Sequence, residues 1–273
     1  MKMKHATETR IRTSHQHKAS GTKASCTAAC LAFSLFGWHS PVFADMLLGI
    51  YAGVGGWQAD YNGEFASEGS NIDVDADLAI DGDHQSFIYV ALEHPIPLLP
   101  NVKISKTDLK NSSTTQLSST ISFEGSTFTS GESVETDLDL SHTDFVAYYE
   151  ILDNWVSLDA GFTARHFTGD ASITGNTLAE SADLDAWVPM GDLKAQFDLP
   201  LTGLYAGGEV NAISFNDNRI TDYSLRIGFD TALRLGVELG YRSMMLELKD
   251  VDDQDFVSDL EMDGAYLALT LHI

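Results

Sequence analysis

Residues 141–166 contain the pattern that most constrains the fold: two runs of alternating apolar and polar side chains, separated by Asp153-Asn154. Asp and Asn tolerate the positive φ of a tight turn, so the pattern predicts a β-hairpin. Placing Leu152 opposite Trp155 gives an apolar face and a charged face. The predicted apolar pairs are Ile151/Val156, Tyr149/Leu158, Ala147/Ala160, Phe145/Phe162 and Thr143/Ala164. Strands of this length suit a tilted bilayer crossing, although a soluble β-sandwich would alternate similarly.

The first 44 residues have the features of an export signal. Six Lys or Arg residues precede an apolar stretch of 13 residues, Cys26–Trp38, and Val42-Phe43-Ala44 offers a cleavage site before Asp45. An apolar stretch of 13 residues is shorter than the ~20 that a membrane-spanning helix needs. We therefore predict a signal peptide over 1–44 and one mature domain over 45–273.

The predicted mature domain is strongly acidic and has no cysteine. Both cysteines, Cys26 and Cys30, lie in the signal, so the domain has neither a disulfide nor a thiolate site. Removing residues 1–44 leaves 10 basic and 39 acidic residues, a net charge of −29. Such a domain does not bind nucleic acid through phosphates, and divalent cations must bridge it to anionic surfaces.

The mature domain contains ten predicted strands, and their connections alternate in length. Short connections at 95–100, 153–154, 200–203 and 231–233 alternate with mostly longer, polar ones, as in membrane barrels. The strands are expected at 47–61, 85–94, 101–109, 141–152, 155–166, 186–199, 204–215, 223–230, 235–248 and 264–273. The predicted fold class is all-β: a closed antiparallel transmembrane β-barrel of about ten strands. The sequence also allows a barrel of eight or twelve strands, because residues 66–80 and 117–138 can pair differently.

Two further predicted hairpins also separate an apolar face from a polar face. Setting Leu199 opposite Leu204 gives an apolar face and brings Lys194 opposite Glu209 on the polar one. Setting Phe229 opposite Leu235 likewise brings Arg226 opposite Glu238. Opposite charges directly across a ladder are favourable, and an apolar face fixes the register.

Four segments, 89–103, 139–144, 148–159 and 240–244, resemble a small family of Gram-negative outer-membrane β-barrel proteins. The resemblance implies a location in the cell outer membrane, contact with outer-membrane lipid and lipopolysaccharide, and insertion by the barrel assembly machinery. The alternating segment 264–273 is similar to the assembly signal of such proteins, although Ile273 replaces the usual final aromatic residue. The resemblance brings no activity, cofactor or catalytic residue.

The strand phase directs thirteen charged side chains into the barrel. We predict that they form ion pairs filling a narrow interior, because buried charges need partners and small barrels have filled interiors. A selective pore is the alternative. The predicted inward charges are Lys103, Arg165, Lys194, Arg226 and Arg242, with Glu93, Asp144, Glu150, Asp159, Asp192, Glu209, Asp230 and Glu238.

The sequence offers candidates for two kinds of chemical site, hydrolytic and metal-binding. Three histidines near predicted outer strand ends, His84, His142 and His166, lie near Asp83, Asp144 and Asp170, and would suit a rim-sited hydrolase (protease or lipid-modifying). Asp250–Asp255 with Glu261 partly follows a calcium loop, but Asp255 stands where that loop needs Gly. We predict no catalytic, cofactor or metal residue, and only loosely bound divalent cations at the acidic loops. The expected role is non-enzymatic: envelope structure, surface interaction or passage of small solutes.

Overall fold

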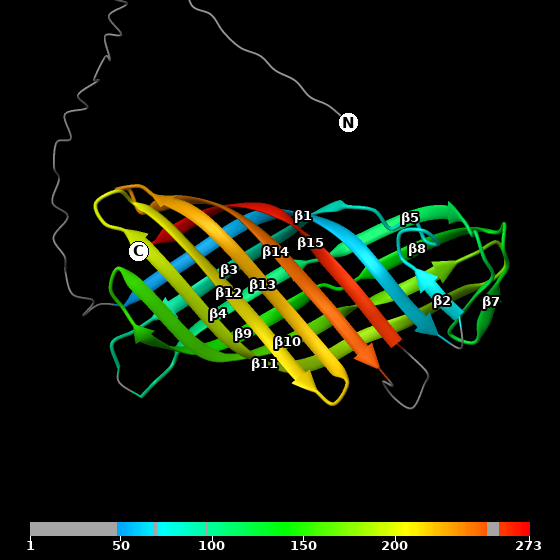
Figure 1. Cartoon of the computed structure of the whole chain (residues 1–273), viewed down its shortest axis with the longest axis horizontal. Coiled ribbons are helices and arrows are strands. Elements are labelled where there is room, and N and C mark those ends of the chain that lie inside the picture. Colours follow the sequence, from blue (N-terminus) through cyan, green and yellow to red (C-terminus); the bar gives the residue numbers. More distant parts are fainter. Residues whose placement is uncertain (1–47, 68–69, 97, 250–256) are drawn as a thin grey trace, which may run out of the picture. The chain divides into compact units, whose positions relative to one another are not determined.

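The computed structural model describes residues 48–67, 70–96, 98–249 and 257–273. Every regular element in these ranges is a β-strand (Figure 1). No helix in the described part of the chain has the length and apolarity needed to cross a membrane. The export signal predicted over 1–44 lies outside the described residues.

Ten antiparallel strands close into a ring, as predicted. In ring order they are β1 (Gly49–Ser67), β3 (Asp83–Glu93), β4 (Asn101–Asp108), β9 (His142–Leu152), β10 (Val156–Thr174), β11 (Ala179–Leu199), β12 (Leu204–Phe215), β13 (Asn218–Asp230), β14 (Leu235–Lys249) and β15 (Val257–His272). Pairing of β15 with β1 completes the ring, so none of the ten ring strands is left as an edge strand. A β-sandwich is therefore excluded.

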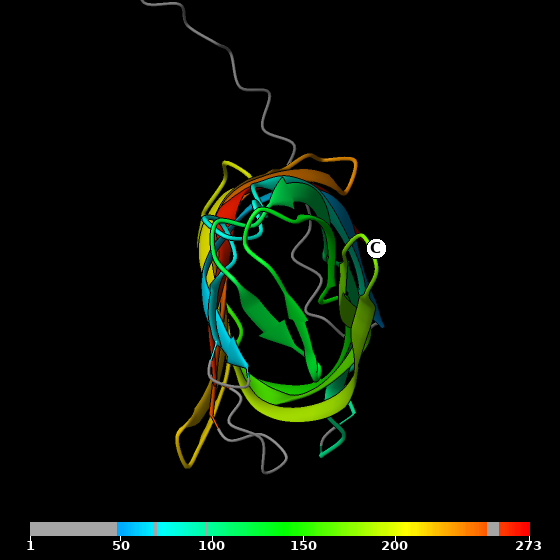
Figure 2. The same cartoon turned by 90° about the vertical axis from the view of Figure 1, so that its right-hand side faces the viewer.

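Five shorter strands lie at one end of the ring, on the right in Figure 1, and three of them, β2, β5 and β8, extend its sheet. The β5–β8 hairpin (Lys110–Gln116 and Ser133–Asp139) continues β4 and β9, and β8 pairs with β10. Strand β2 (Ser70–Asp73) pairs with β1, and β6 (Ile121–Phe123) pairs with β7 (Ser126–Phe128). Figure 2 looks into the ring from this end. Residues 110–138 thus form a hairpin extension of the barrel wall.

The first hairpin is registered two residues away from its predicted pairing. Ala160 lies opposite Tyr149 rather than Ala147, and a bulge separates Leu158 from Asp159. Side chains alternate with a period of two, so a shift of two residues leaves each one on its predicted face.

A second hairpin shows the same shift. Phe229 of β13 pairs with Val237 of β14 rather than with Leu235, whereas Leu199 pairs with Leu204 as predicted. The four short connections lie together at the end opposite the β5–β8 extension, as ring order and strand direction require.

An apolar belt surrounds the outside of the barrel near the short connections. Phe145, Phe162, Leu225 and Leu239 are 43–61% exposed there, as the predicted outward face requires. The other exposed members include Ile50, Val54, Ile88, Val90, Val102, Ile104, Trp187, Leu193, Phe197, Ile227, Val237, Leu267 and Leu269. In water this belt would be an unusually large exposed apolar surface.

Towards the extended end, the polarity of the two faces reverses. On β14, Met244 and Leu246 point inward and are buried, while Glu247 of the same strand is outside the barrel. These side chains join an apolar core that also contains Phe123, Phe128 and residues of the 72–80 segment. The barrel therefore has two levels, one with a polar interior and an apolar exterior, and one with the opposite arrangement.

Candidate functional site: the charged barrel interior

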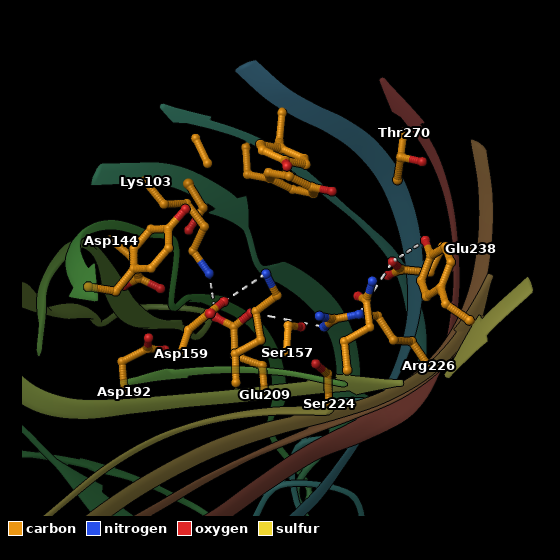
Figure 3. A pocket seen from close by; sticks show the side chains of 18 of the residues that line it. Lys103, Asp144, Ser157, Asp159, Asp192, Glu209, Ser224, Arg226, Glu238 and Thr270 are labelled. Atoms are coloured by element: carbon orange, nitrogen blue, oxygen red, sulfur yellow. Dashed lines mark hydrogen bonds and ion pairs between the residues drawn. The ribbon is translucent and has the colours of Figure 1, made fainter. Parts of the chain in front are cut away.

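A cavity of about 380 Å³ occupies the interior near the short connections. All thirteen charged side chains that were predicted to point inward line it, together with Asp222. Lining residues extend from Asp153 and Asn154, at a short connection, to Arg165 and Arg242 farther inside. Figure 3 shows part of this charged lining.

One ion pair crosses the lumen near the middle of the cavity. Lys103 on β4 donates to Glu209 on β12, four positions away in the ring of ten strands (Figure 3). On neighbouring strands, Lys194 Nζ lies 3.1 Å from Asp159 Oδ2. The predicted pairing of Lys194 with Glu209 is therefore present as a register pair, but each side chain bonds elsewhere.

Arg226 and Glu238 form the centre of a second group. Arg226 Nε lies 3.6 Å from Glu238 Oε2, diagonally across β13 and β14 because of the two-residue shift. The hydroxyls of Tyr205 and Tyr266 donate to Glu238 at 3.1 and 2.6 Å. Two hydroxyl donors and one ion pair thus hold one carboxylate, which satisfies a charge held almost out of contact with water.

Arg165 is the most completely buried charge of the barrel. It is fully buried, and its Nε and Nη2 donate to the two oxygens of Asp144 at 2.7 and 2.8 Å. Its Nη2 also donates to Asp222 Oδ2 at 2.7 Å. The two-residue register shift places Asp144 directly opposite Arg165 and so makes the bidentate bond possible.

Arg242 extends this cluster across the barrel. Its Nε and Nη2 donate to Asp222 at 2.9 and 2.7 Å, and its guanidinium lies 4.8 Å from the Trp57 ring centre. Nη2 also lies 3.3 Å from Nε2 of His142, whose Nδ1 is 3.0 Å from the Leu140 carbonyl oxygen. Since the carbonyl can only accept, Nδ1 carries the proton, and Nε2 accepts from Arg242. His142 is therefore neutral.

The three predicted histidines do not converge. His142 is buried inside the barrel, whereas His84 is exposed on the outside. His166 also faces outward, stacked on Trp187, with Nε2 2.8 Å from Asp185 Oδ1. His142 points inward because of its position in the alternation, and it lies next to Arg242. No shared catalytic geometry connects these three side chains.

The acidic segments show no metal centre within the described ranges. Asp250–Asp255 lies outside the described residues, and Glu261 accepts a bond from Ser243 Oγ at 2.9 Å. In the 73–83 segment, Asp73 instead accepts from the backbone N–H groups of Asp75 and Ala76. Among the residues that the structure describes, no three His, Cys, Asp or Glu side chains are grouped to hold a metal ion.

Comparisons with known proteins give similarity at the level of structure only. No family model matches the chain. No curated protein matches it either. The translocator domain of autotransporter NalP from Neisseria meningitidis aligns at 10% identity and TM-score 0.45, covering 82% of this chain and 88% of that one. Ail, the attachment invasion locus protein of Yersinia pestis, in complex with the heparin analogue sucrose octasulfate, aligns at 13% identity and TM-score 0.32. That alignment covers 82% of this chain and 99% of Ail.

A third solved structure, a Pseudomonas aeruginosa FadL homologue, aligns at 12% identity and TM-score 0.33, covering 82% of this chain and 64% of that one. At these identities and TM-scores, no activity is transferred from the three structures to this chain.

Sequence reasoning missed Asp222, the acceptor shared by Arg165 and Arg242. The predicted strand starts at Tyr223 and so leaves out Asp222, although Asp222 points inward like Ser224 and Arg226. Extending the alternation by one residue would have found it.

Proposed function

We propose that the protein is an outer-membrane β-barrel that does not conduct ions and that presents an acidic β-extension at the cell surface. The apolar belt supports the membrane location, because lipid is the environment in which such an exterior is stable. Short connections face the periplasm in bacterial barrels and longer ones face outward, which supports an extracellular position for the β5–β8 extension.

The contact between Arg242 and His142 carries the proposal of a closed interior. Strands β14 and β9 are five positions apart in a ring of ten, so side chains from opposite walls meet there. Beyond this contact the interior is the apolar core, in which Phe128, Ile121 and Leu78 are almost fully buried. Close packing of apolar side chains opposes a continuous path for water and ions.

The surface role rests on the chemistry of the extension. Its outward side chains on β8 include Glu135 and Asp137, both exposed, and its interior is packed like that of a soluble domain. A packed acidic extension offers a stable surface for cationic partners or for divalent ions shared with lipopolysaccharide phosphates. In this proposal the barrel serves as an anchor for that surface.

Planar-bilayer recording of the refolded protein tests the closure. We expect no steady conductance steps from protein whose insertion is verified by heat-modifiable gel migration, while an open porin recorded under the same conditions gives its normal steps. Steady, ion-selective steps of the wild type would contradict the proposed closure. Density-gradient fractionation of Gram-negative membranes tests the location, with recovery in the inner membrane as the contrary result.

A further inference from the structure

The cavity lining has an excess of negative charge. Eleven Asp or Glu side chains line it, against five Lys or Arg side chains. The five cations are bonded to five of the carboxylates: Asp144, Asp159, Asp222, Glu209 and Glu238. Six carboxylates form no ion pair within the part of the chain that the structure describes.

Five of those six carboxylates surround the opening near the short connections. Glu150 faces the like charges of Glu93 and Asp153 there. The complete set at the opening is Glu93, Glu150, Asp153, Asp198 and Asp230. A cleft lined with one sign of charge and walled by low-dielectric material concentrates ions of the opposite sign.

The sixth carboxylate, Asp192, lies deeper and has an unsatisfied oxygen. Its side chain is more than nine-tenths buried, lines the cavity, and its Oδ1 has no hydrogen-bond partner (Figure 3). The nearby ammonium of Lys103 is bonded to Glu209, and that of Lys194 is bonded to Asp159. A buried carboxylate oxygen without a donor costs free energy, which a ligand N–H donor would recover.

The spacing of these groups indicates what kind of ligand they accommodate. Gly161 of β10 lies opposite Asp192 of β11 and opposite Tyr148 of β9, so Asp192 and Tyr148 are at the same level of the barrel. Glu150 follows Tyr148 by two residues on β9. It is therefore two strands away from Asp192 and one inward-facing residue nearer the opening. From strand separation and rise, their backbones are about 12 Å apart. Tyr89 and Tyr148 line the same cavity, and aromatic faces favour both alkyl chains and ammonium groups.

From this arrangement we infer that the lumen binds a linear organic polycation, an alkyl chain with an ammonium group at each end, which enters by the short-connection opening. One ammonium group lies among the five carboxylates at the opening, near Glu150, and the other donates to Asp192 Oδ1. The alkyl segment lies along the tyrosines. Inorganic dications suit the site less well, because they require several oxygens converging on one point, whereas these carboxylates are spread along the cavity.

Calorimetric titration of the refolded protein with spermidine, a linear triamine, tests the inference at 150 mM salt. The variant Asp192→Asn/Glu150→Gln is compared with Asp137→Asn/Glu135→Gln, which makes the same charge change on the exposed extension. We expect saturable binding by the wild type, at least a tenfold loss of affinity in the lumen variant, and less than a twofold change in the control. Heat-modifiable migration verifies that both variants are folded.

Three results would overturn the inference: no saturable binding by the wild type, equal losses in the two variants, or Mg²⁺ binding that is stronger than spermidine binding and equally sensitive to the lumen variant. The single variants Asp192→Asn and Glu150→Gln serve if the double variant does not fold. Each is expected to weaken spermidine more than it weakens the monoamine butylamine, which can occupy only one end of the site. Equal weakening of both amines would also contradict the inference.

Discussion

Arg242 and His142 meet inside the barrel from opposite walls, with Nη2 of the arginine 3.3 Å from Nε2 of the neutral imidazole. The contact marks the boundary between the two levels of the molecule. On one side lies the polar cavity, and on the other lies the apolar core that contains Phe128. Buried charges at such a boundary depend on one another, because each arginine satisfies a carboxylate that has little access to water.

Removing one member of this cluster should therefore destabilise the barrel strongly. Arg165→Met leaves Asp144 without a partner and Asp222 with only Arg242, and we expect the free energy of unfolding to fall by about 3–5 kcal/mol. Urea unfolding of the refolded protein measures this change. The control is Arg219→Met, whose exposed pair with Glu247 spans 3.9 Å and contributes at most about 1 kcal/mol. Equal changes in the two variants would contradict the assignment.

A charge placed on the apolar belt tests the lipid-facing assignment. Leu239 lies near the middle of the outward face of β14, so Leu239→Arg is expected to cost about 2–4 kcal/mol in a bilayer. Unfolding in lipid vesicles gives the value. Ser112→Arg, on the exposed face of the β5 extension, should cost less than about 0.5 kcal/mol. If Leu239→Arg were equally harmless, the belt would not face lipid.

Which side chains point inward and which point outward could be predicted from the sequence, because each face of the wall around the polar interior has a uniform polarity. Phe162 and Arg165 fall on opposite faces under any register that keeps the alternation, and the structure places them outside and inside. The exact pairing could not be predicted, since a shift of two residues leaves both faces unchanged. The register that joins Asp144 to Arg165 follows the bulge at Leu158 and Asp159, which the alternation does not reveal.

The second level could not be predicted for a different reason. The alternation of Met244, Leu246 and Leu248 continues that of the strand, but it belongs to the opposite face from Leu239. A pattern with a period of two does not reveal which face is buried once the surrounding medium changes from lipid to water. The core also includes the 72–80 segment, which has little regular structure and whose position depends on contacts distant in sequence.

Truncation of the second core should loosen the extension without opening the membrane barrel. Phe128 is fully buried, so Phe128→Ala is expected to cost about 3–5 kcal/mol locally. We predict faster hydrogen exchange and protease cleavage within 111–137, with unchanged protection of β11–β14 and unchanged heat-modifiable migration. Thr127→Ala, the exposed neighbour on β7, is the matched control. Loss of protection throughout the ring would show that the two levels unfold together.

The base of the extension should be sensitive to acid. Burial alone would raise the pKa of Asp139, but hydrogen bonds from Lys110 and Ser141 outweigh it and hold the pKa below the usual 3.8. A carboxylate with a lowered folded pKa contributes stability above its unfolded pKa and loses that contribution as the pH falls through its folded pKa. We therefore expect exchange protection of β5 and β8 to be constant above about pH 5 and to decrease below the usual carboxyl range.

The variant Asp139→Asn separates this effect from general acid unfolding. It should lower the protection of β5 and β8 at neutral pH and remove the specific decrease in acid, because no proton is taken up at position 139 on unfolding. Asp137→Asn, on an exposed side chain of the same strand, should keep the wild-type profile. An acid decrease that is unchanged in Asp139→Asn would assign it to other carboxylates. Protection of β11–β14 in the same samples shows whether the ring itself has begun to open.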